Sequence, residues 1–405
     1  MTHKSINNQK NAKKHIRKSY LAEAVSAAII ASVISTPVWS QTSDEVIIVT
    51  ANKSNQSIQD VPLAITALSG EFMSEVHLTD VKDLVSYTPG ITGNSQDSFI
   101  DAISVRGIRT QDFGIGGDPS TAFFKNDLYE GRNGSAVSTL FDMDRAEILR
   151  GPQGFLFGRN SIAGAISVHT RQAELDTNSG FMEMDVAEFN HATISGAVNV
   201  PVSDTFAMRF AGIYSTEEGF TENTFNGDTL GGHDKAALRW STTYQSGDLA
   251  VYSMVEYENR ELSGSVYRAI DQGDIWDAFD TAFGGVNIGG GNQGIDSDQS
   301  QGEGDDSEVL NLGLKIEYDL GFADLTSSTG YKDHDYFYSE DYDGTPLNVN
   351  NYQQDQKGDY FQQEVRLNFK KDGPLGWYIG ASYYKENIDT KFKFIGAEDT
   401  VGRLA

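Results

Sequence analysis

The 405-residue sequence contains no cysteine, which excludes disulfides, cysteine zinc sites and thiol nucleophiles. Proline is scarce, with 8 residues, whereas 41 glycines and 18 tyrosines favour strands and turns over long helices. Basic residues are a minority, because 31 Lys and Arg stand against 58 Asp and Glu, for a net charge of −27. Binding of nucleic-acid phosphates needs clustered Lys and Arg, so the charge argues against a nucleic-acid partner.

Long apolar runs are confined to the N-terminus, and no later segment suits a transmembrane helix. Six Lys and Arg precede the small, apolar segment 21–38, and Val38-Trp39-Ser40 follows a small-residue cleavage rule. This order predicts a signal peptide over residues 1–40 and a mature chain that starts at Gln41. A membrane anchor is the alternative. Export in a Gram-negative cell is favoured because the segment is shorter than a comfortable ~20-residue span.

Catalytic and nucleotide-binding motifs are also missing. The 7 histidines are scattered without metal-ligand spacing, and no Gly-x-Ser-x-Gly elbow occurs. The glycine-rich stretch 149–170 has no Lys for a phosphate loop and lacks the Gly-x-Gly-x-x-Gly spacing of a dinucleotide site. We therefore predict no enzyme, no cofactor and no metal site.

That stretch, LRGPQGFLFGRNSIAGAISVHT, is typical of a tight turn followed by a strand. Pro152 suits the first central position of the turn that starts at Gly151, because its ring fixes φ. From Ala165 to Thr170 the side chains alternate as they do in a β-strand. The residues by themselves predict a compact turn between two strands.

Beyond residue 178, apolar and polar side chains alternate with period two. Leu312 and Leu314, for example, alternate with Asn311 and Lys315. This pattern is typical of a transmembrane β-strand and equally of a strand in a soluble sandwich. The segments that follow it lie near 180–189, 191–201, 204–216, 235–246, 248–260, 309–319, 322–336, 359–371 and 375–388.

The lengths of the links between these segments favour a membrane barrel. Outer-membrane barrels have short periplasmic turns and long outer loops, whereas a sandwich has no reason to sort its links in this way. We therefore predict a mainly β chain with an antiparallel transmembrane β-barrel in the cell outer membrane. Apart from the first hairpin, short links at 201–203, 246–247, 320–321 and 372–374 alternate with long ones at 217–234, 261–308 and 337–358.

One long link is strongly acidic. From Asp271 to Glu308 it carries ten acidic residues and no Lys or Arg. The spacing of an EF-hand fails, since Gly302 and Glu308 fall one position late when Asp296 is taken as the first ligand. A solvated surface loop is the main interpretation, and a loosely bound divalent ion in 271–308 stays open.

Several short motifs follow one another between residues 44 and 171. The first is a mobile, β-prone run of the kind that adds as a strand to a partner's sheet, with an ordinary first strand as the alternative. In this order the motifs resemble the TonB-dependent outer-membrane receptors, and the first one is similar to a TonB box. The box comprises Asp44, Glu45, Val46, Ile47, Ile48, Val49, Thr50 and Ala51, and the later motifs are 59–65, 83–91, 103–108 as the central strand of the plug, 113–119 and 149–170.

The resemblance implies a globular α/β plug domain inside a barrel of about 22 strands. Nine predicted strands are too few, so we expect the barrel to be incomplete here, with about nine of 22 strands, from a truncated gene or a fragment. The implied divisions are a signal peptide at 1–40, a periplasmic N-terminus with the box at 41–52, a plug at 53–172 and the N-terminal part of the barrel at 173–405.

The resemblance also implies a latch between plug and barrel. Arg106 and Arg150 match plug positions whose guanidinium groups pair with barrel carboxylates, and Glu364 matches one such carboxylate. The alternation independently places Glu364 on the lumen face, and a guanidinium holds a carboxylate with two hydrogen bonds. The segment 123–127 departs from the Tyr-Val-Asp-Gly turn of the family, so a different turn is expected there.

The function implied by the resemblance is active import of a scarce nutrient, most commonly a ferric siderophore. The implied partners are the TonB energy-coupling complex, the small-molecule ligand and outer-membrane lipid, with no nucleic acid. Asp112, Phe113 and Asp118 of the plug are the predicted ligand contacts.

Other functions remain open at this point. An oligosaccharide or plant-derived compound would stack on Trp276 and on the tyrosines of 336–342, although these aromatics suit a barrel girdle better. A secreted β-rich lectin or hydrolase is a different class. A signal transducer is disfavoured, because its extra domain has no room between Gln41 and Asp44.

Overall fold

The computed structural model describes residues 48–49, 56–93, 103–110, 118–132, 138–264, 266–269, 294–299, 304–348, 350–370 and 376–396. The chain forms two compact units, Met1–Val46 and Ile47–Ala405, and every described residue belongs to the second. The predicted signal peptide therefore lies outside the described residues.

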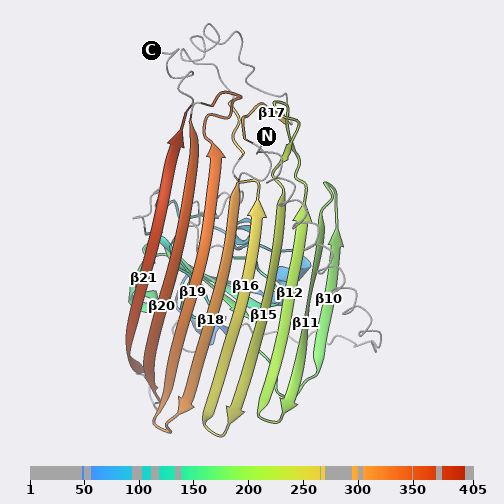
Figure 1. The fold of residues 1–405 in the computed structure, drawn as a ribbon. Coiled ribbons are helices and arrows are strands. Elements are labelled where there is room, and N and C mark those ends of the chain that lie inside the picture. The colour runs from blue at the N-terminus through green and yellow to red at the C-terminus, as the bar shows by residue number, and fades with distance from the viewer. Residues whose placement is uncertain are drawn as a thin grey trace. The chain divides into compact units, whose positions relative to one another are not determined.

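A nine-stranded antiparallel sheet dominates the second unit (Figure 1), and its strands pair in chain order. Each of the nine predicted segments forms one strand, so the period-two pattern located all of them. The strands are β10 (Ser179–Val186), β11 (Ala192–Ser203), β12 (Phe206–Glu217), β15 (His233–Ser246), β16 (Leu249–Leu262), β18 (Asp305–Asp319), β19 (Ala323–Asp341), β20 (Asn351–Phe369) and β21 (Trp377–Ile395).

The faces of this sheet are inverted relative to those of a soluble protein. On β15, Leu238 is 69% exposed and Trp240 is 44% exposed, whereas Arg239 between them is 3% exposed. On β18, Leu312 and Leu314 are exposed in the same way. A soluble sandwich buries its apolar face, so this exposure rejects the sandwich and fits strands that present apolar side chains to lipid.

The strands extend further toward the long links than predicted. β19 continues to Asp341 and β20 begins at Asn351, so the predicted link 337–358 shrinks to nine residues, 342–350. The pattern missed the start of β20 because its outward positions, such as Gln353, Asp355 and Lys357, are polar. Backbone pairing continues there without an apolar face. The acidic residues 305–308, predicted to be loop, likewise form the start of β18.

Small elements occupy the long links. Short strands form a three-stranded sheet that joins the links 218–232 and 263–304. Among the described strands, β10 and β21 each pair on one side only, so the barrel is not closed here. Within the described part of the chain, no helix is both long and apolar enough to cross a membrane. The strands of the small sheet are β13 (Thr221–Asn223), β14 (Thr229–Leu230) and β17 (Gly294–Ile295).

A second, five-stranded sheet comes earlier in the chain and supplies most of the apolar core. Its order is β3-β8-β9-β6-β7, with β6 and β9 parallel. The helical segments η2 (Val81–Tyr87) and α2 (Gly70–Glu75) contribute Val81, Leu84 and Met73 to the core around Ile148 and Ile166. The strands are β3 (Ile65–Ser69), β6 (Thr121–Lys125), β7 (Leu128–Tyr129), β8 (Met143–Arg150) and β9 (Gly164–Thr170).

The glycine-rich stretch joins the two central strands of this sheet. β8 ends at Arg150, Gly151 turns the chain with φ 102°, and β9 begins at Gly164. The predicted strand is confirmed, and the link that precedes it contains a short helix, α3 (Gly154–Phe157), that was not predicted.

The predicted central strand at 103–108 is wrong. Only β5 (Ser104–Val105) forms there, and it pairs with β4 (Ile91–Thr92) in a separate two-stranded sheet. The strand is cut short because Arg106 and Gly107 have φ of 53° and 80°, which turns the backbone out of the extended conformation. The central strand of the larger sheet is β9 instead, between β8 and β6.

Gly70 tests how tightly α2 packs on the sheet. A Cβ added to Gly70 would lie 1.9 Å from the carbonyl oxygen of Met143 in β8, so Gly70→Ala must push the helix away. We expect a cost of about 1–3 kcal/mol, visible as a lower unfolding temperature of the purified protein by circular dichroism. Gly154→Ala is the control, since a Cβ there meets nothing within 4 Å. Equal unfolding temperatures for both variants would contradict this packing.

Candidate functional site: the interface between the two sheets

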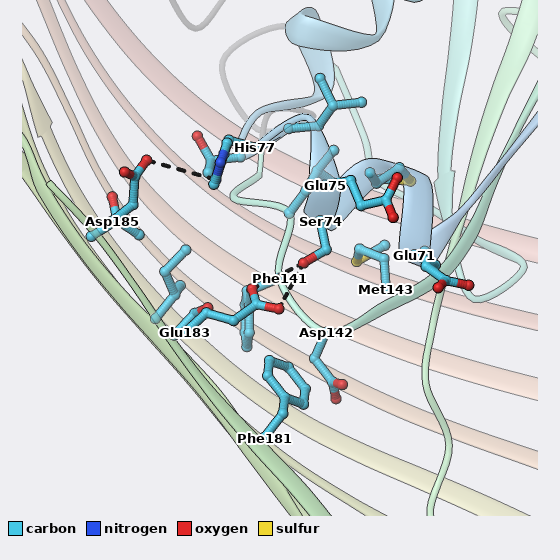
Figure 2. A pocket seen from close by; sticks show the side chains of 18 of the residues that line it. Glu71, Ser74, Glu75, His77, Phe141, Asp142, Met143, Phe181, Glu183 and Asp185 are labelled. Atoms are coloured by element: carbon cyan, nitrogen blue, oxygen red, sulfur yellow. Dashed lines mark hydrogen bonds and ion pairs between the residues drawn. The ribbon is translucent and has the colours of Figure 1, made fainter. Parts of the chain in front are cut away.

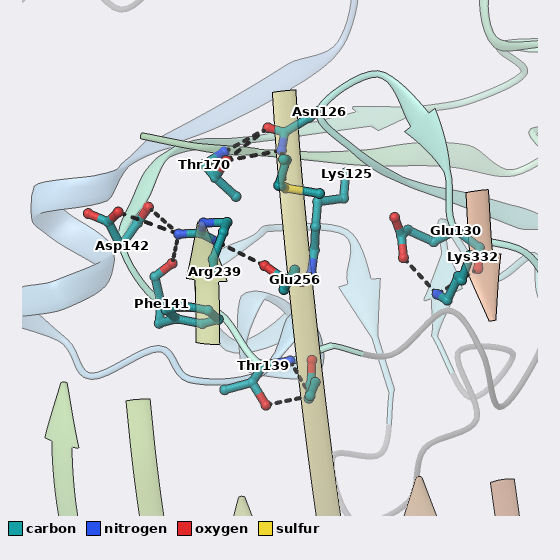
Figure 3. A network of polar contacts seen from close by, with 12 residues as sticks. Lys125, Asn126, Glu130, Thr139, Phe141, Asp142, Thr170, Arg239, Glu256 and Lys332 are labelled. Carbon is teal, nitrogen blue, oxygen red and sulfur yellow. Dashed lines mark hydrogen bonds and ion pairs between the residues drawn. The ribbon is translucent and has the colours of Figure 1, made fainter. Parts of the chain in front are cut away.

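Buried charges of alternating sign join the five-stranded sheet region to the nine-stranded sheet (Figure 3). Lys125 Nζ lies 2.5 Å from Glu256 Oε1, and Glu256 Oε2 lies 3.0 Å from Arg239 Nη1. Arg239 Nη2 lies 3.5 Å from Asp142 Oδ2, and Asp142 Oδ1 lies 2.5 Å from Arg209 Nη2. We call these five residues the ion chain. Its members are almost fully buried, so each charge depends on its neighbours for compensation.

Local structure explains the position of Lys125. It ends β6 just before a two-residue hairpin, in which Asn126 and Asp127 both have positive φ. Such turns favour Asn and Asp, and this is the turn that replaces the family's Tyr-Val-Asp-Gly sequence. Burial alone would lower the pKa of Lys125, but the negative charge of Glu256 and other nearby carboxylates raises it, so the ammonium form persists.

The strands of the nine-stranded sheet hold the other members by register. Arg239 of β15 is directly opposite Glu256 of β16, where cross-strand side chains are near neighbours. Arg239 also donates hydrogen bonds to the carbonyl oxygens of Phe141 and Asp142, at 2.8 and 3.0 Å. Its guanidinium carbon lies 4.4 Å from the centre of the Phe141 ring. Charge, hydrogen bonds and ring contact therefore fix one segment, 141–142, against β15.

A second buried cluster surrounds Asp80, the N-cap of η2. Arg260 Nη2 lies 2.7 Å and Lys235 Nζ 3.7 Å from Asp80 Oδ2. Burial alone would raise the pKa of Asp80, but the positive charges of Arg260 and Lys235 lower it from 3.8 to about 2. Beside it, Glu258 Oε1 accepts hydrogen bonds from the backbone N–H and the hydroxyl of Thr139, at 2.9 and 2.6 Å.

A third group of contacts reaches the other half of the nine-stranded sheet. Lys332 Nζ of β19 lies 2.7 Å from Glu130 Oε2 and 3.0 Å from the Glu130 carbonyl oxygen. The side chain of Gln362 in β20 accepts from the backbone N–H of Tyr129 and donates to its carbonyl oxygen, both at 2.9 Å. Arg132 Nη2 lies 2.5 Å from Glu386 Oε1 of β21. The contacts thus extend from β12 to β21.

A cavity of about 670 Å³ lies where these contacts are sparse, between α2 and strands β10–β12 (Figure 2). Its wall combines apolar side chains such as Met73 and Phe181 with polar contacts. The hydroxyl of Ser74 donates to the carboxylate of Glu183 at 2.9 Å, and His77 Nδ1 lies 3.6 Å from Asp185 Oδ2.

Comparisons with known proteins identify the two parts. Residues 57–165 match the family model named TonB-dependent Receptor Plug Domain. Residues 57–165 are the plug domain of a TonB-dependent receptor. The remaining sheet is part of a barrel like those of the TonB-dependent outer-membrane receptors, and the chain belongs in the outer membrane of a Gram-negative cell, as predicted.

Similar proteins cover the chain in part. It is 28% identical over 165 residues to the ferripyoverdine receptor of Pseudomonas aeruginosa, which covers 40% of the chain and 19% of that receptor. It is 27% identical over 168 residues to the pesticin receptor of Yersinia pestis, covering 41% and 24%. The crystal structure of the ferric yersiniabactin uptake receptor of Yersinia pestis matches with a TM-score of 0.66 at 17% identity, covering 82% of this chain and 50% of that one.

The matches show how much of each relative the chain spans and what kind of protein the relatives are. The chain spans about half the length of the solved structure and less of the curated relatives. The relatives are named as receptors and transporters rather than enzymes, which agrees with the expectation that the chain is not an enzyme.

The predicted latch residues have other partners in the structure. Arg150 Nη1 donates to the carbonyl oxygen of Pro89 at 2.9 Å, within the plug. Glu364 faces the lumen as predicted, since it shares its side of β20 with Gln362, and it pairs with Arg366 at 2.8 Å. The Arg106 guanidinium lies beside Gly151. In the described part of the chain, the ion chain, the cluster around Asp80 and the contacts of β19 to β21 link plug and barrel. The latch of Arg106, Arg150 and Glu364 stays a prediction.

The TonB box and the predicted ligand contacts are described only in part. Ile48 and Val49 form β1 (Ile48–Val49), which pairs with β2 (Gln56–Ser57), and Val49 is fully buried. Asp118 accepts a hydrogen bond from Asn160 at 3.1 Å and lies 3.4 Å from Arg159. Its role in ligand binding stays a prediction. The rest of the box (Asp44, Glu45, Val46, Ile47, Thr50 and Ala51) and the sites Asp112 and Phe113 lie outside the described residues.

The tyrosines of 336–342 divide between two environments. Tyr336 and Tyr338 are 1% and 2% exposed and share the side of β19 that carries Lys332 toward the plug. They are therefore not girdle aromatics. Tyr342 is 38% exposed and stacks on Tyr267. Trp276 lies outside the described residues.

Sequence reasoning had a signal for the barrel half of the interface. Arg209, Arg239 and Lys315 stand at polar positions of the predicted strands, and each one contacts the plug. Their partners were missed because Asp142 and Asp127 occur in segments without a repeating pattern.

Loss of Glu256 should be costly, because its carboxylate compensates both Lys125 and Arg239. We expect Glu256→Gln to destabilise the attachment of the plug by about 3–5 kcal/mol, since it leaves buried cations without their carboxylate. Urea unfolding of the purified protein in detergent, with protease digestion of the plug as a second readout, measures the change.

The matched control is an ion pair on an exposed part of the barrel. Lys357 and Asp335 form an ion pair, but their side chains are 72% and 54% exposed. Asp335→Asn should change stability by less than about 1 kcal/mol. A Glu256→Gln variant as stable as this control would contradict a compensating role for the ion chain.

Asp80 predicts a dependence of stability on pH. Because its pKa is lowered from 3.8 to about 2 in the folded protein, the carboxylate stabilises the fold above about pH 4 and loses this contribution as the pH falls toward 2. Asp80→Asn keeps a side chain suited to the N-cap but removes the charge. Urea unfolding should show a gap of about 2 kcal/mol between wild type and variant at neutral pH that shrinks below pH 4. A gap independent of pH would contradict the assignment.

Proposed function

We propose that the chain serves TonB-dependent import of a ferric siderophore across the outer membrane. The observation that carries this proposal is a plug domain attached by buried ion pairs to the polar face of a sheet whose apolar face is exposed. This arrangement suits a lipid-embedded wall that encloses a removable plug.

The names of similar proteins support the substrate class. One relative is a ferripyoverdine receptor, another a ferrichrome outer membrane transporter, and a third an iron-regulated outer membrane virulence protein. A solved structure with the same fold is a ferric yersiniabactin uptake receptor. An iron-chelating small molecule is therefore the proposed ligand, with an oligosaccharide or plant-derived compound as the alternative.

The energy source follows from the location. The outer membrane offers no nucleotide supply, and the sequence has no phosphate-binding loop. We propose that the TonB energy-coupling complex binds residues 44–51 and transmits force from the inner membrane to the plug. Within the box, Val49 packs in an apolar cluster with Phe124 and Leu149 of the plug.

Substitution in the box separates coupling from ligand binding. Ile48→Pro removes a backbone N–H that an added strand would need. In cells whose receptor gene carries this substitution, we expect uptake of iron-labelled siderophore to be abolished. Binding of the siderophore at the cell surface should persist. Ile48→Val, which preserves the strand, is the control.

Two results would count against the proposal. Uptake that continues in cells without TonB would reject the coupling mechanism. Growth on an oligosaccharide that depends on this gene, with no effect of the gene on iron uptake, would favour the alternative ligand.

A further inference from the structure

Two histidines and a glutamate gather outside the contacts described above. His191 precedes β11, Glu217 ends β12 and His233 begins β15. One candidate ligand atom from each, a ring nitrogen or a carboxylate oxygen, lies within 4.8 Å of the others. We call these three residues the His–Glu cluster.

Strand register brings the cluster together. Glu217 is directly opposite His233, and His191 follows on from the Ala192–Thr216 pair on the other side of β12. The three residues therefore form one row across three neighbouring strands, at the end of the sheet that carries the long links. No sequence motif indicates this site, because His191 and Glu217 are 26 residues apart and only the pairing of the strands brings them together.

The distance between the first two ligands suits a metal centre. His191 Nδ1 lies 2.9 Å from Glu217 Oε2. Two ligands bound at about 2.0–2.1 Å to a tetrahedral zinc ion are separated by about 3.3 Å. Small side-chain rotations would therefore open the cluster enough to admit an ion.

Hydroxyl groups hold the other nitrogen of each ring. His233 Nε2 lies 2.8 Å from Ser215 Oγ, and His191 Nε2 lies 3.3 Å from Thr193 Oγ1. The two hydroxyls are 2.7 Å apart. Histidines that bind metals usually donate their second N–H to a fixed acceptor, which orients the ring. This pair of hydroxyls supplies such acceptors, and for His191 it leaves Nδ1, the nitrogen beside Glu217, as the ligand atom.

The surrounding charges suit a cation. Asp185 Oδ2 lies 3.9 Å from His191 Nε2 and adds negative charge beside the cluster. Lys235, two residues beyond His233, is engaged with Asp80 at 3.7 Å, so its charge is partly compensated.

We propose that His191, Glu217 and His233 bind a divalent transition-metal ion of the zinc class. Two imidazoles and one carboxylate are a ligand set that zinc accepts, with water in the fourth position, whereas calcium and magnesium prefer oxygen ligands alone. The ion would join the first hairpin to β12 and β15 and so fasten the ends of these strands together. The three residues are not among the predicted ligand contacts, and the metal site does not depend on the proposed import.

Direct titration tests the site. The full-length protein, purified in detergent without a histidine tag and stripped with EDTA, is titrated with Zn²⁺ by calorimetry. Co²⁺ is added in parallel, because its visible spectrum reports tetrahedral coordination. We expect a single Zn²⁺ ion per chain and a cobalt band that Zn²⁺ removes.

Variants then assign the ligands. Glu217→Gln keeps the size of the side chain and its ability to accept a hydrogen bond, and should weaken Zn²⁺ binding on the order of 100-fold, at least the effect of losing a residue that orients a ligand. His233→Ala should abolish binding. His77→Ala is the matched control, since His77 also contacts Asp185, at 3.6 Å, but lies outside the cluster.

Each outcome decides the proposal. Absence of both Zn²⁺ heat and a cobalt band in the wild type would overturn it and leave a hydrogen-bonded histidine–glutamate pair. Unchanged affinity in Glu217→Gln, or an equal loss in His77→Ala, would also overturn the assignment. If His233→Ala fails to fold, the wild-type spectrum and Glu217→Gln still decide.

Discussion

The structure depends on one constraint, that a charge removed from water needs an opposite charge beside it. Transfer of an isolated ion into a protein interior costs several kcal/mol, and partners recover this only when the geometry is good. The ion chain meets the requirement by alternating signs from Lys125 through Glu256, Arg239 and Asp142 to Arg209. Because plug and barrel each contribute members of both signs, neither surface is satisfied without the other. The chain therefore defines where the plug sits on the barrel wall.

The same constraint explains the inverted sheet. A strand that faces lipid also needs outward side chains that tolerate hydrocarbon over the membrane-spanning part of its length. The polar side chains then collect on the other face, where Arg239 and Asn311 are buried while Leu238 and Leu312 are exposed. A polar inner face in turn requires a polar surface on the plug. The ion chain and the apolar exterior are thus two results of one pattern along each strand.

This pattern was readable from the sequence, and features that do not repeat were not. Period two located nine strands and placed Arg209, Arg239 and Glu364 on the inner face. The partner of each cation depends on how the plug is seated, which no local pattern encodes, and the contacts found involve Asp142 and Asp80 rather than the predicted latch. Motif similarity failed at 103–108 for a related reason, since two residues with positive φ ended the strand. The His–Glu cluster was hidden because strand register alone unites residues that are scattered along the chain.

Val49 of the predicted box and Lys125 of the ion chain are connected through one apolar cluster. This connection suggests a route by which the proposed coupling would release the plug. Val49 packs in the same apolar cluster as Phe124, and Phe124 is followed in the chain by Lys125. If the proposed coupling displaces β1, Val49 would leave this cluster and the packing beside β6 would weaken. Movement of Lys125 would leave the carboxylate of Glu256 with Arg239 as its remaining partner in the ion chain, so its charge would be less well compensated. Removal of the plug as a rigid body would break all pairs of the ion chain together, which opposes such a movement. Force applied near β6 would instead act first on the pair of Lys125 and Glu256. A short path from the box to Lys125 would let a pull on the N-terminus break the pairs in sequence rather than at once.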